Sequence, residues 1–541
     1  MVNSTFNKSY LFKLLGTKLL DKKLEELIMK MGFDVEGHTK EEVQIDFPAN
    51  RPDLIDIVGF ARAARNFMHK GREIRYETQS TTPEFEIEVG TAVKDIRPFI
   101  SGMVVKGIKF DEESLRHLLN FTEKFTSNFG RGRRKLAIGL HDLSSVEPPL
   151  VYDAIPDETF LALNMPKSMK FSQILSSSDK GKAYASTLQG SKLYPAVKDA
   201  KGAISLVPIL NSERTKVTAS TNSMFIEITG TNRYAVEKSA DLFASIFIDM
   251  GAKVLPIKVR YGNSSTILPK MEETQIKIPL IKIESQIGVI IGFNNVISLA
   301  NKMGYKAGLL GRDIKFWVPT YRLDVINDQD VVEDIAIGYG YDYIQPVPVF
   351  AEQVGELEES SKRNARLSET MLGLGFSEAL NSFMSNEETN FAKMRLAKPA
   401  SSYVKVRDAK MQQITMLRTW VIPSLLSNIG MSLHEKMPQR LFETDYAFTI
   451  DKKINEVQNL AGVITDPKAN FNQIKSVVES VMRSIGAQYQ IRESLHRSFI
   501  EGRSASIILN GNEIGVFGEL HPEVLVNFGI EEPSVAFEIS L

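Results

Sequence analysis

Apolar residues recur at helical spacing after a short apolar strand in the segment 316–344. The strand is expected at Phe316–Val318, and the helix after it carries one apolar stripe, made of Val331, Val332, Ile335 and Tyr339. The same order of patterns occurs near the N-terminus, with an amphipathic helix over 21–31, a strand over 43–47 and a second helix over 53–68. Both segments therefore predict small domains in which amphipathic helices lie on a core.

The two segments are copies of one unit. In each, a helix with a Met-Gly-aromatic stop precedes a strand, a Pro-x-x-Arg-x-Asp motif and another helix. The matched positions are Pro48 with Pro319, Arg51 with Arg322, and Asp53 with Asp324. Two copies are too few for a solenoid, so the repeat predicts two small domains of one type.

An acid cluster distinguishes the second copy. Asp330, Glu333 and Asp334 are three and four residues apart on one helix face, and Asp324 lies on the preceding turn. Such close carboxylates repel one another, by about 0.2–0.5 kcal/mol per helix pair, so they must be solvated, paired with a cation or holding a metal. Acids in a first helical turn also complement the helix dipole, and Arg322 could supply the counter-charge. If a metal is held, oxygen-only ligands suit Mg²⁺.

The middle of the chain, 81–262, alternates short strands with turns and a few helices. Leu206–Asn211 and Met224–Thr229 are expected to be adjacent strands, and 235–250 a helix. The basic loop Asn128–Lys135 could contact phosphate groups or could be a solvated charged loop. Runs of charged residues are more often solvated loops.

From residue 360 onward, longer helices separate the strands. Helices are expected over 362–374 and 416–431, a strand pair over 440–448, and two strands around an Asn510-Gly511 hairpin turn. Helices packed on one side of a largely antiparallel sheet indicate the α+β class. The chain is therefore predicted to be α+β and multidomain.

Composition excludes several kinds of chemistry. The 541 residues carry a net charge of −1, so any nucleic-acid contact must come from local patches. Without cysteine, the chain forms no disulfide, thiolate nucleophile or cysteine-ligated zinc site. Phosphate-loop, dinucleotide, zinc-protease and nucleophile-elbow motifs are also missing, which favours a subunit or a binding protein. With no long apolar run and no targeting peptide, we expect a cytoplasmic protein.

Several motifs in combination resemble the β subunit of phenylalanyl-tRNA synthetase, of the archaeal or eukaryotic type. They are Asn50–Leu54, Phe225–Gly230, the segment from Pro319 through the acid cluster to Tyr341, and Gly518–Pro522. The resemblance covers essentially the whole chain and implies four domains. These are an N-terminal α+β domain (1–80), a mixed α/β editing-like domain (81–262), a magnesium-binding domain (263–350) and a degenerate class II synthetase-like domain with an antiparallel sheet (351–541).

The resemblance also implies a metal and partners. In the family, acids at the positions of Asp324, Asp330, Glu333 and Asp334 bind Mg²⁺. The β subunit pairs with an α subunit, two of each, and the α subunit holds the site where ATP and phenylalanine react and tRNA(Phe) is charged. No catalytic residue for aminoacylation is therefore expected in this chain, whose Gly518–Pro522 segment lacks the arginine that would hold ATP.

The middle domain resembles the family's editing domain, which hydrolyses mischarged tyrosyl-tRNA. A site that hydrogen-bonds the tyrosine hydroxyl can recognise it strongly, whereas a phenylalanine pocket excludes it weakly. Glu227 and Thr229 share one strand face and match the family's pocket positions. Asn211, Ser212 and His141 lie on segments that could close the same site. Without the resemblance, the strand is more simply one with a polar exposed face.

The predicted function is that of a phenylalanine–tRNA ligase β subunit that also hydrolyses tyrosyl-tRNA. Two alternatives stay open. One is a standalone RNA-binding or scaffolding protein that has kept the fold, and the other is an autonomous editing hydrolase.

Overall fold

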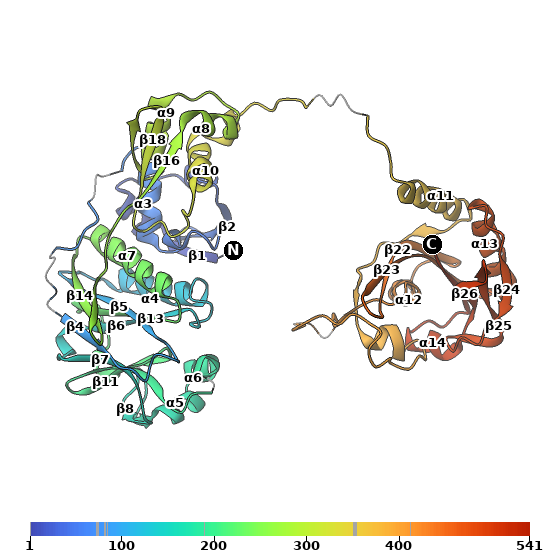
Figure 1. Ribbon diagram of the computed structural model, residues 1–541, viewed down its shortest axis with the longest axis horizontal. Helices are drawn as coiled ribbons and strands as arrows, with labels where there is room; N and C mark the ends of the chain where they lie inside the picture. Colours follow the sequence, from blue (N-terminus) through green and yellow to red (C-terminus); the bar gives the residue numbers. More distant parts are fainter. Residues whose placement is uncertain are drawn as a thin grey trace. The chain divides into compact units, whose positions relative to one another are not determined.

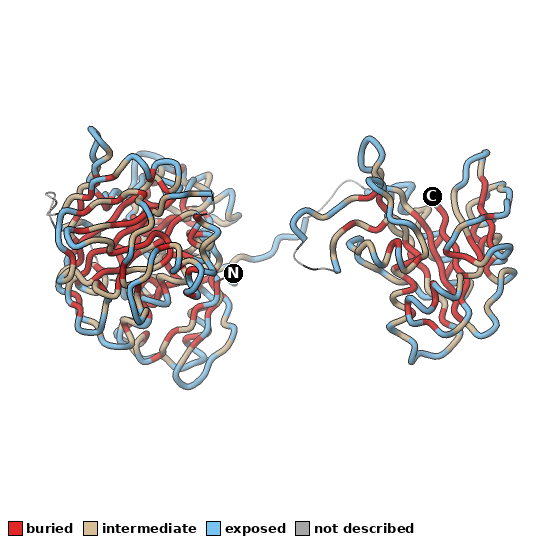
Figure 2. The backbone as a smooth tube through the Cα atoms, turned by 90° about the horizontal axis from the view of Figure 1, so that it is seen from below, coloured by how far each residue is buried: buried red, intermediate tan, exposed pale blue. Residues whose placement is uncertain are grey.

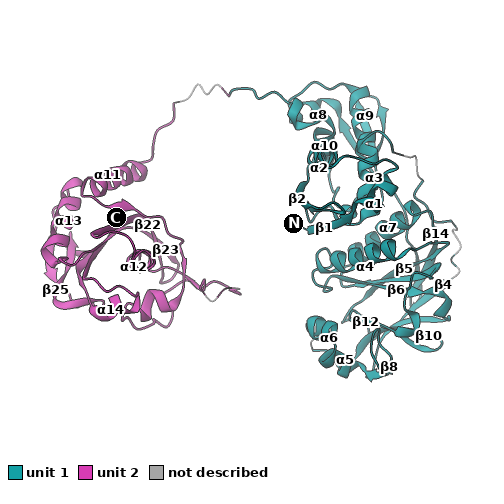
Figure 3. Cartoon of the chain, turned by 180° about the vertical axis from the view of Figure 1, so that it is seen from behind, with its two compact units in different colours: residues 1–348 teal, residues 349–541 magenta. Residues whose placement is uncertain are grey.

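The computed structural model describes residues 2–71, 75–79, 83, 85–188, 190–349, 354–409, 411 and 413–541. The chain divides into two compact units, 1–348 and 349–541 (Figure 3). Buried residues gather in the interior of each unit, and exposed residues lie at its surface (Figure 2). Each unit therefore has a hydrophobic core of its own.

The first and last parts of unit 1 share one topology. Each is a three-stranded antiparallel sheet with the third strand in the middle, two helices between the first and second strands, and a helix after the third. The N-terminal copy consists of β1 (Val2–Asn7), α1 (Lys8–Leu15), α2 (Asp21–Lys30), β2 (Asp34–His38), β3 (Glu42–Phe47), η1 (Pro52–Leu54) and α3 (Ile57–Phe67). The central copy consists of β16 (Thr274–Pro279), α8 (Leu280–Ile287), α9 (Phe293–Lys302), β17 (Lys306–Leu310), β18 (Asp313–Val318) and α10 (Asp328–Tyr339), followed by η5 (Tyr341–Tyr343). The strand order and helix positions agree with the sequence repeat.

The helix expected over 53–68 is divided into two pieces. The short η1 turn ends at Leu54. Asp56 then caps α3, because its side chain accepts hydrogen bonds from the backbone N–H groups of Val58 (2.8 Å) and Gly59 (3.0 Å). Asn327 caps α10 in the same way and forms a capping box with Asp330.

The middle part of unit 1 is built on one ten-stranded mixed sheet. Its strand order is β12-β11-β10-β7-β4-β14-β5-β13-β6, and β15 pairs with β14. The strands are β4 (Phe85–Val89), β5 (Phe99–Lys106), β6 (Leu136–Asp142), β7 (Leu150–Ile155), β10 (Tyr194–Asp199), β11 (Gly202–Leu206), β12 (Leu210–Asn211), β13 (Ser223–Gly230), β14 (Lys253–Tyr261) and β15 (Ser264–Leu268). Helices α4 (Glu112–Ser127) and α7 (Arg233–Asp249) lie along β5, β13 and β6 (Figure 1). Met224, Ile226 and Ile228 of β13 join the core of these helices, so Glu227 and Thr229 project from the opposite face.

Smaller elements complete this part. They are η2 (Leu143–Ser145), β8 (Thr159–Phe160), β9 (Met169–Lys170), α5 (Phe171–Ser177), α6 (Asp179–Tyr184), η3 (Ala185–Leu188) and η4 (Glu213–Thr215). The expectation that Leu206–Asn211 and Met224–Thr229 are adjacent strands is wrong. Leu206 ends β11, a turn follows, and β13 pairs with β5 and β6 instead.

Unit 2 is a seven-stranded sheet in the order β19-β22-β23-β27-β26-β25-β24, antiparallel except for β19 beside β22. Its elements are α11 (Glu359–Gly373), β19 (Ser377–Glu378), β20 (Met384–Ser385), η6 (Glu388–Ala392), β21 (Met416–Leu417), α12 (Ile422–Met431), β22 (Gln439–Ile450), β23 (Ile454–Thr465), α13 (Phe471–Ser484), β24 (Gln490–Glu493), β25 (Phe499–Leu509), β26 (Asn512–Leu520), α14 (Pro522–Asn527) and β27 (Ser534–Ser540). The Asn510-Gly511 hairpin turn is confirmed, with both residues at positive φ.

Helices cover both faces of this sheet, and the expectation of one covered side is wrong. Leu460 and Ile464 of β23 pack with α11 and α13, whereas Ala461 and Val463 pack with α12 and α14. Alternate residues of one strand point to opposite faces, so the sheet lies between two helical layers. The strand pair expected over 440–448 is a single long strand, β22.

Candidate functional site

A small cavity lies where the two ends of the large sheet approach each other. Glu227 and Thr229 of β13 and Gly139 of β6 form one wall, and the segment Val207–Asn211 forms the other. Asn211 joins the walls, because its Nδ2 donates to the carbonyl oxygen of Leu140 (3.1 Å). The cavity has a volume of about 30 Å³, which is room for a water molecule in this state.

Glycines on both neighbouring strands make space for Glu227. The residue lies opposite Gly102 of β5 and Gly139 of β6. A Cβ atom at Gly139 would lie 2.4 Å from Glu227 Oε1, so the carboxylate occupies the position that a side chain on β6 would fill. The carboxylate is buried, and no group in the described part of the chain hydrogen-bonds its Oε2. Glu227 therefore offers a free acceptor at the cavity.

His141 faces Glu227 with a buried ring nitrogen. Its Nδ1 lies 2.8 Å from Thr215 Oγ1, and the Thr215 hydroxyl donates to the carbonyl oxygen of Ser212 (3.3 Å). Thr215 therefore accepts from Nδ1–H. The Nε2 atom is buried without a hydrogen-bond partner among the described residues, 3.7 Å from Glu227 Oε1. His141 and Glu227 thus each have a buried polar atom without a partner beside the cavity.

Thr229 is held by a buried arginine that the sequence pattern did not single out. Arg97 Nε donates to Thr229 Oγ1 (3.1 Å) and Nη2 to the Thr229 carbonyl oxygen (2.8 Å). Its Nη1 donates to the carbonyl oxygen of Arg133 (2.9 Å). Burial lowers the pKa of Arg97 to about 10, a value at which the side chain stays charged at neutral pH. A buried cation therefore lies directly behind the cavity wall.

The basic loop Asn128–Lys135 reaches the same cavity. Arg131 and Arg134 are exposed, but Arg133 is buried and lines the cavity. Arg133 Nη1 donates to the carbonyl oxygens of Pro208 (3.0 Å) and Ile209 (2.9 Å), and its Nη2 to Glu123 (2.7 Å). The loop is thus partly structural, because one of its arginines fixes the facing wall of the cavity.

The structure brings together four of the five predicted editing residues. Glu227, Thr229 and Asn211 line one cavity, and His141 lies beside Glu227. Ser212 instead caps η4 and hydrogen-bonds the carbonyl oxygen of Leu161 (3.2 Å). The interpretation of β13 as a strand with an exposed polar face is wrong, since Glu227 and Thr229 are both 2 % exposed.

The acid cluster is organised by Arg322. Arg322 donates through Nε and Nη2 to both carboxylate oxygens of Asp324 (2.9 and 2.8 Å), and Nη2 also contacts Asp334 (2.6 Å). The Tyr305 hydroxyl donates to Asp334 as well. Burial by itself raises the pKa of Asp324, but the guanidinium of Arg322 outweighs it and holds that pKa below the ordinary value. Arg322 is thus the counter-charge of two of the four acids.

The other two acids point elsewhere. Asp330 Oδ2 accepts hydrogen bonds from the backbone N–H groups of Ile326 (2.7 Å) and Asn327 (2.8 Å), and Glu333 is exposed. Within the described ranges, no group of three or more histidine, aspartate or glutamate side chains is placed to hold a metal ion. Asp324, Asp330, Glu333 and Asp334 therefore do not form a ready ligand set for Mg²⁺, and the magnesium site stays a prediction.

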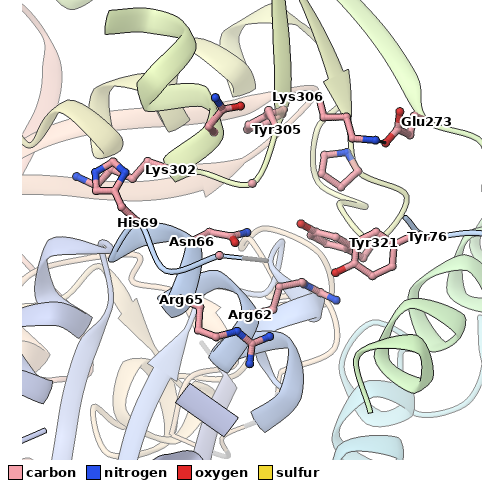
Figure 4. Close-up of a pocket in the computed structure, with 14 residues that line it drawn as sticks. Arg62, Arg65, Asn66, His69, Tyr76, Glu273, Lys302, Tyr305, Lys306 and Tyr321 are labelled. Carbon is pink, nitrogen blue, oxygen red and sulfur yellow. Dashed lines mark ion pairs between the residues drawn. The ribbon is translucent and has the colours of Figure 1, made fainter. Parts of the chain in front are cut away.

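The two repeat copies meet at their Pro-x-x-Arg-x-Asp motifs. Arg51 binds both oxygens of Asp53 (3.0 and 2.9 Å), as Arg322 binds Asp324, and Arg51 Nε also lies 3.8 Å from Asp324 Oδ2. A cavity of about 380 Å³ lies at the same junction (Figure 4). On its wall, the Arg62 guanidinium stands 3.5 Å from the centre of the Tyr321 ring and pairs with Asp249 (2.5 Å). These contacts join the two copies to α7.

In unit 2, Phe442 and Glu443 are buried residues of β22, inside the sheet. Glu443 is fully buried and accepts from Arg418 (2.6 Å) and from the side chain of Asn381 (2.7 Å). Arg418 is also fully buried. Both side chains are thus committed to internal contacts.

Three family models match successive parts of the chain. They are the B3/4 domain (81–245), the tRNA synthetase B5 domain (276–341) and the phenylalanyl-tRNA synthetase beta chain CLM domain (345–541). The fold and these domains define a chain of a multidomain aminoacyl-tRNA synthetase. Across the described residues, no helix is long and apolar enough to cross a membrane.

Relatives and solved structures fix the family. The chain is 36 % identical over 515 residues to the phenylalanine–tRNA ligase beta subunit of Archaeoglobus fulgidus, covering 94 % of this chain and 93 % of that one. It is 32 % identical to the corresponding subunit of Methanocaldococcus jannaschii, over 99 % of this chain and 98 % of the relative. An N-terminal fragment of the phenylalanyl-tRNA synthetase beta subunit from Pyrococcus horikoshii matches 63 % of this chain and all of the fragment, with a TM-score of 0.60 and 28 % identity. The chain belongs to the family of phenylalanine–tRNA ligase beta subunits.

Proposed function

We propose that this chain acts with an α subunit, as two copies of each, to join phenylalanine to tRNA(Phe) at the expense of ATP. The family membership supports this assignment, and the buried Glu443–Arg418 pair is consistent with unit 2 being a supporting domain. In this proposal ATP and phenylalanine bind the α subunit, and this chain contributes assembly and tRNA contact.

The test is reconstitution. Phenylalanine-dependent charging of tRNA should need both chains and should be absent with either chain alone. A complex that forms but does not charge tRNA, while a β subunit from a relative restores charging with the same α subunit, would favour a standalone RNA-binding or scaffolding role.

We further propose that the cavity at Glu227 is an editing site that hydrolyses tyrosyl-tRNA. The single observation that carries this proposal is a buried carboxylate with a free oxygen beside the Thr229 hydroxyl. A tyrosine hydroxyl can donate to Glu227, whereas a phenylalanine ring leaves the buried carboxylate unpaired, and that difference supports strong discrimination. Because the cavity has a volume of only about 30 Å³, it must widen to admit a ring.

The editing proposal is tested by deacylation of preformed tyrosyl-tRNA(Phe). Glu227→Ala should slow hydrolysis at least about tenfold while phenylalanine charging is unchanged. Glu237→Ala is the matched control, since Glu237 lies on α7 across the sheet and pairs with Arg233 and Lys270. Unchanged deacylation in Glu227→Ala would refute the site. Equal hydrolysis by the isolated chain and by the complex would favour an autonomous editing hydrolase.

A further inference from the structure

The hydrogen bonds of Thr229 determine what its hydroxyl can offer to the cavity. A threonine hydroxyl has one proton to donate and lone pairs that accept. Arg97 Nε, 3.1 Å away, can only donate, because a guanidinium has no acceptor. The Arg97 bond therefore uses a lone pair of Thr229 Oγ1 and leaves the hydroxyl proton free.

The position of Arg97 is itself tightly fixed. The side chain is 3 % exposed, and its contacts with Thr229, Arg133 and Arg134 use all three nitrogens of the guanidinium. The Tyr152 hydroxyl donates to the Arg97 carbonyl oxygen (2.7 Å) and holds the backbone. Among the described residues, the Arg97 guanidinium donates to one hydroxyl and three carbonyl oxygens and to no carboxylate. The carboxylate of Glu227, two residues before Thr229 on the cavity wall, attracts this cation electrostatically.

We propose that Arg97 is a positioning residue that makes Thr229 a hydrogen-bond donor to the occupant of the cavity. This inference rests on the proposed editing function. The cavity then presents a donor, the Thr229 hydroxyl, and an acceptor, Glu227 Oε2, side by side on one strand. A phenolic hydroxyl both donates and accepts, so it satisfies both groups, whereas a phenyl ring satisfies neither. Arg97 thereby contributes to specificity without touching the substrate.

A double-mutant cycle in the reconstituted complex tests this role. Arg97→Met and Thr229→Val should each lower kcat/KM for tyrosyl-tRNA deacylation by about tenfold, the effect of one hydrogen bond. The double variant should lose no more than either single variant, because Arg97 acts through the hydroxyl that Thr229→Val removes. Deacylation of phenylalanyl-tRNA should change little in all three. Losses that multiply to about a hundredfold, or equal losses with both substrates, would overturn the proposal.

Two further variants separate positioning from folding. Arg97→Lys keeps the charge but donates from a single point, so it should lose tyrosine selectivity even if Arg97→Met does not fold; full selectivity in Arg97→Lys would contradict the proposal. Thr229→Ser keeps the donor and should retain selectivity. Tyrosyl-tRNA hydrolysis absent from the wild-type complex, with normal phenylalanine charging, would overturn the editing function and this inference together. Hydrolysis that persists with selectivity unaffected by Arg97→Met would overturn this inference alone.

Discussion

At the scale of single residues, unit 1 uses buried arginines to hold acids and hydroxyls. Arg322 holds Asp324 and Asp334, Arg51 holds Asp53, and Arg97 holds Thr229. A buried charge that loses its partner costs far more than an exposed one, so these positions should be sensitive to substitution.

Arg322→Ala should destabilise unit 1 by about 3–5 kcal/mol, because two buried carboxylates lose their cation. The exposed Arg312, between β17 and β18, is the control, and Arg312→Ala should change stability by no more than about 0.5 kcal/mol. Urea unfolding measures both. The folded pKa of Asp324 is depressed, so its contribution is full above the unfolded value near 4 and is lost as pH falls. Arg322→Ala should therefore also weaken the loss of stability in acid, and equal acid sensitivity of both proteins would contradict this role.

Asp56 predicts a pH dependence of opposite sign. Burial raises its pKa to about 6, although the N–H groups of Val58 and Gly59 partly offset the rise. The folded state then binds a proton that the unfolded state has released, so stability falls as pH rises from about 4 to about 6. Asp56→Asn keeps the helix cap and should remove this fall, which amounts to at most ~3 kcal/mol. Parallel unfolding midpoints of the two proteins from pH 4 to pH 7 would refute the assignment.

Magnesium on the acid cluster can be tested directly. If Asp324 and Asp334 bind Mg²⁺, they must leave Arg322, and Asp330 must turn from the helix cap. Calorimetric titration with MgCl₂ should show a binding heat that Asp330→Asn/Glu333→Gln abolishes. No heat with the wild-type chain and α subunit together would leave arginine, chiefly Arg322 with Arg51 beside Asp324, as the counter-charge of the cluster.

At the scale of elements, the periodicity of apolar residues identified most helices and strands, but it did not identify which strands pair with each other. The strand Met224–Thr229 was predictable from its apolar alternation, whereas its pairing with β5 and β6 depends on contacts distant in the sequence. Glu227 and Thr229 were predictable only through the family resemblance. Arg97 could not be predicted as a site residue, because no sequence pattern indicates that a single arginine before a strand is buried. The role of Gly139 in making space for Glu227 could be inferred only from the strand register, which places the two residues opposite each other.

Gly139→Ala tests that register. The added methyl group would lie 2.4 Å from Glu227 Oε1 and must displace the carboxylate. Tyrosyl-tRNA deacylation should fall at least about tenfold, with phenylalanine charging retained. Gly373→Ala is a control, because Gly373 is the last residue of α11 in unit 2 and a Cβ there meets open space. Normal deacylation by Gly139→Ala would show that Glu227 does not work from this position.

At the scale of the whole molecule, the sequence repeat has a structural counterpart. The repeat appears as two domains of one topology, and the two compact units divide between 348 and 349. The junction of the copies was not predictable, because Arg51 and Asp324 approach each other only after both domains have folded. The prediction placed helices on only one face of the unit 2 sheet. Successive residues of β23 are apolar, however, and point alternately to the two faces, so both faces are covered by helices.

In the proposed function, this chain assembles a phenylalanine ligase and clears tyrosine errors from its tRNA. The most direct measurement is the level of tyrosyl-tRNA(Phe) formed by the reconstituted α and β subunits when tyrosine is the only amino acid supplied. The wild-type complex should hold almost none and hydrolyse ATP continuously, whereas the Glu227→Ala complex should accumulate tyrosyl-tRNA and charge phenylalanine normally. Equal tyrosyl-tRNA levels in the two complexes, or no phenylalanine charging by the wild type, would contradict the account.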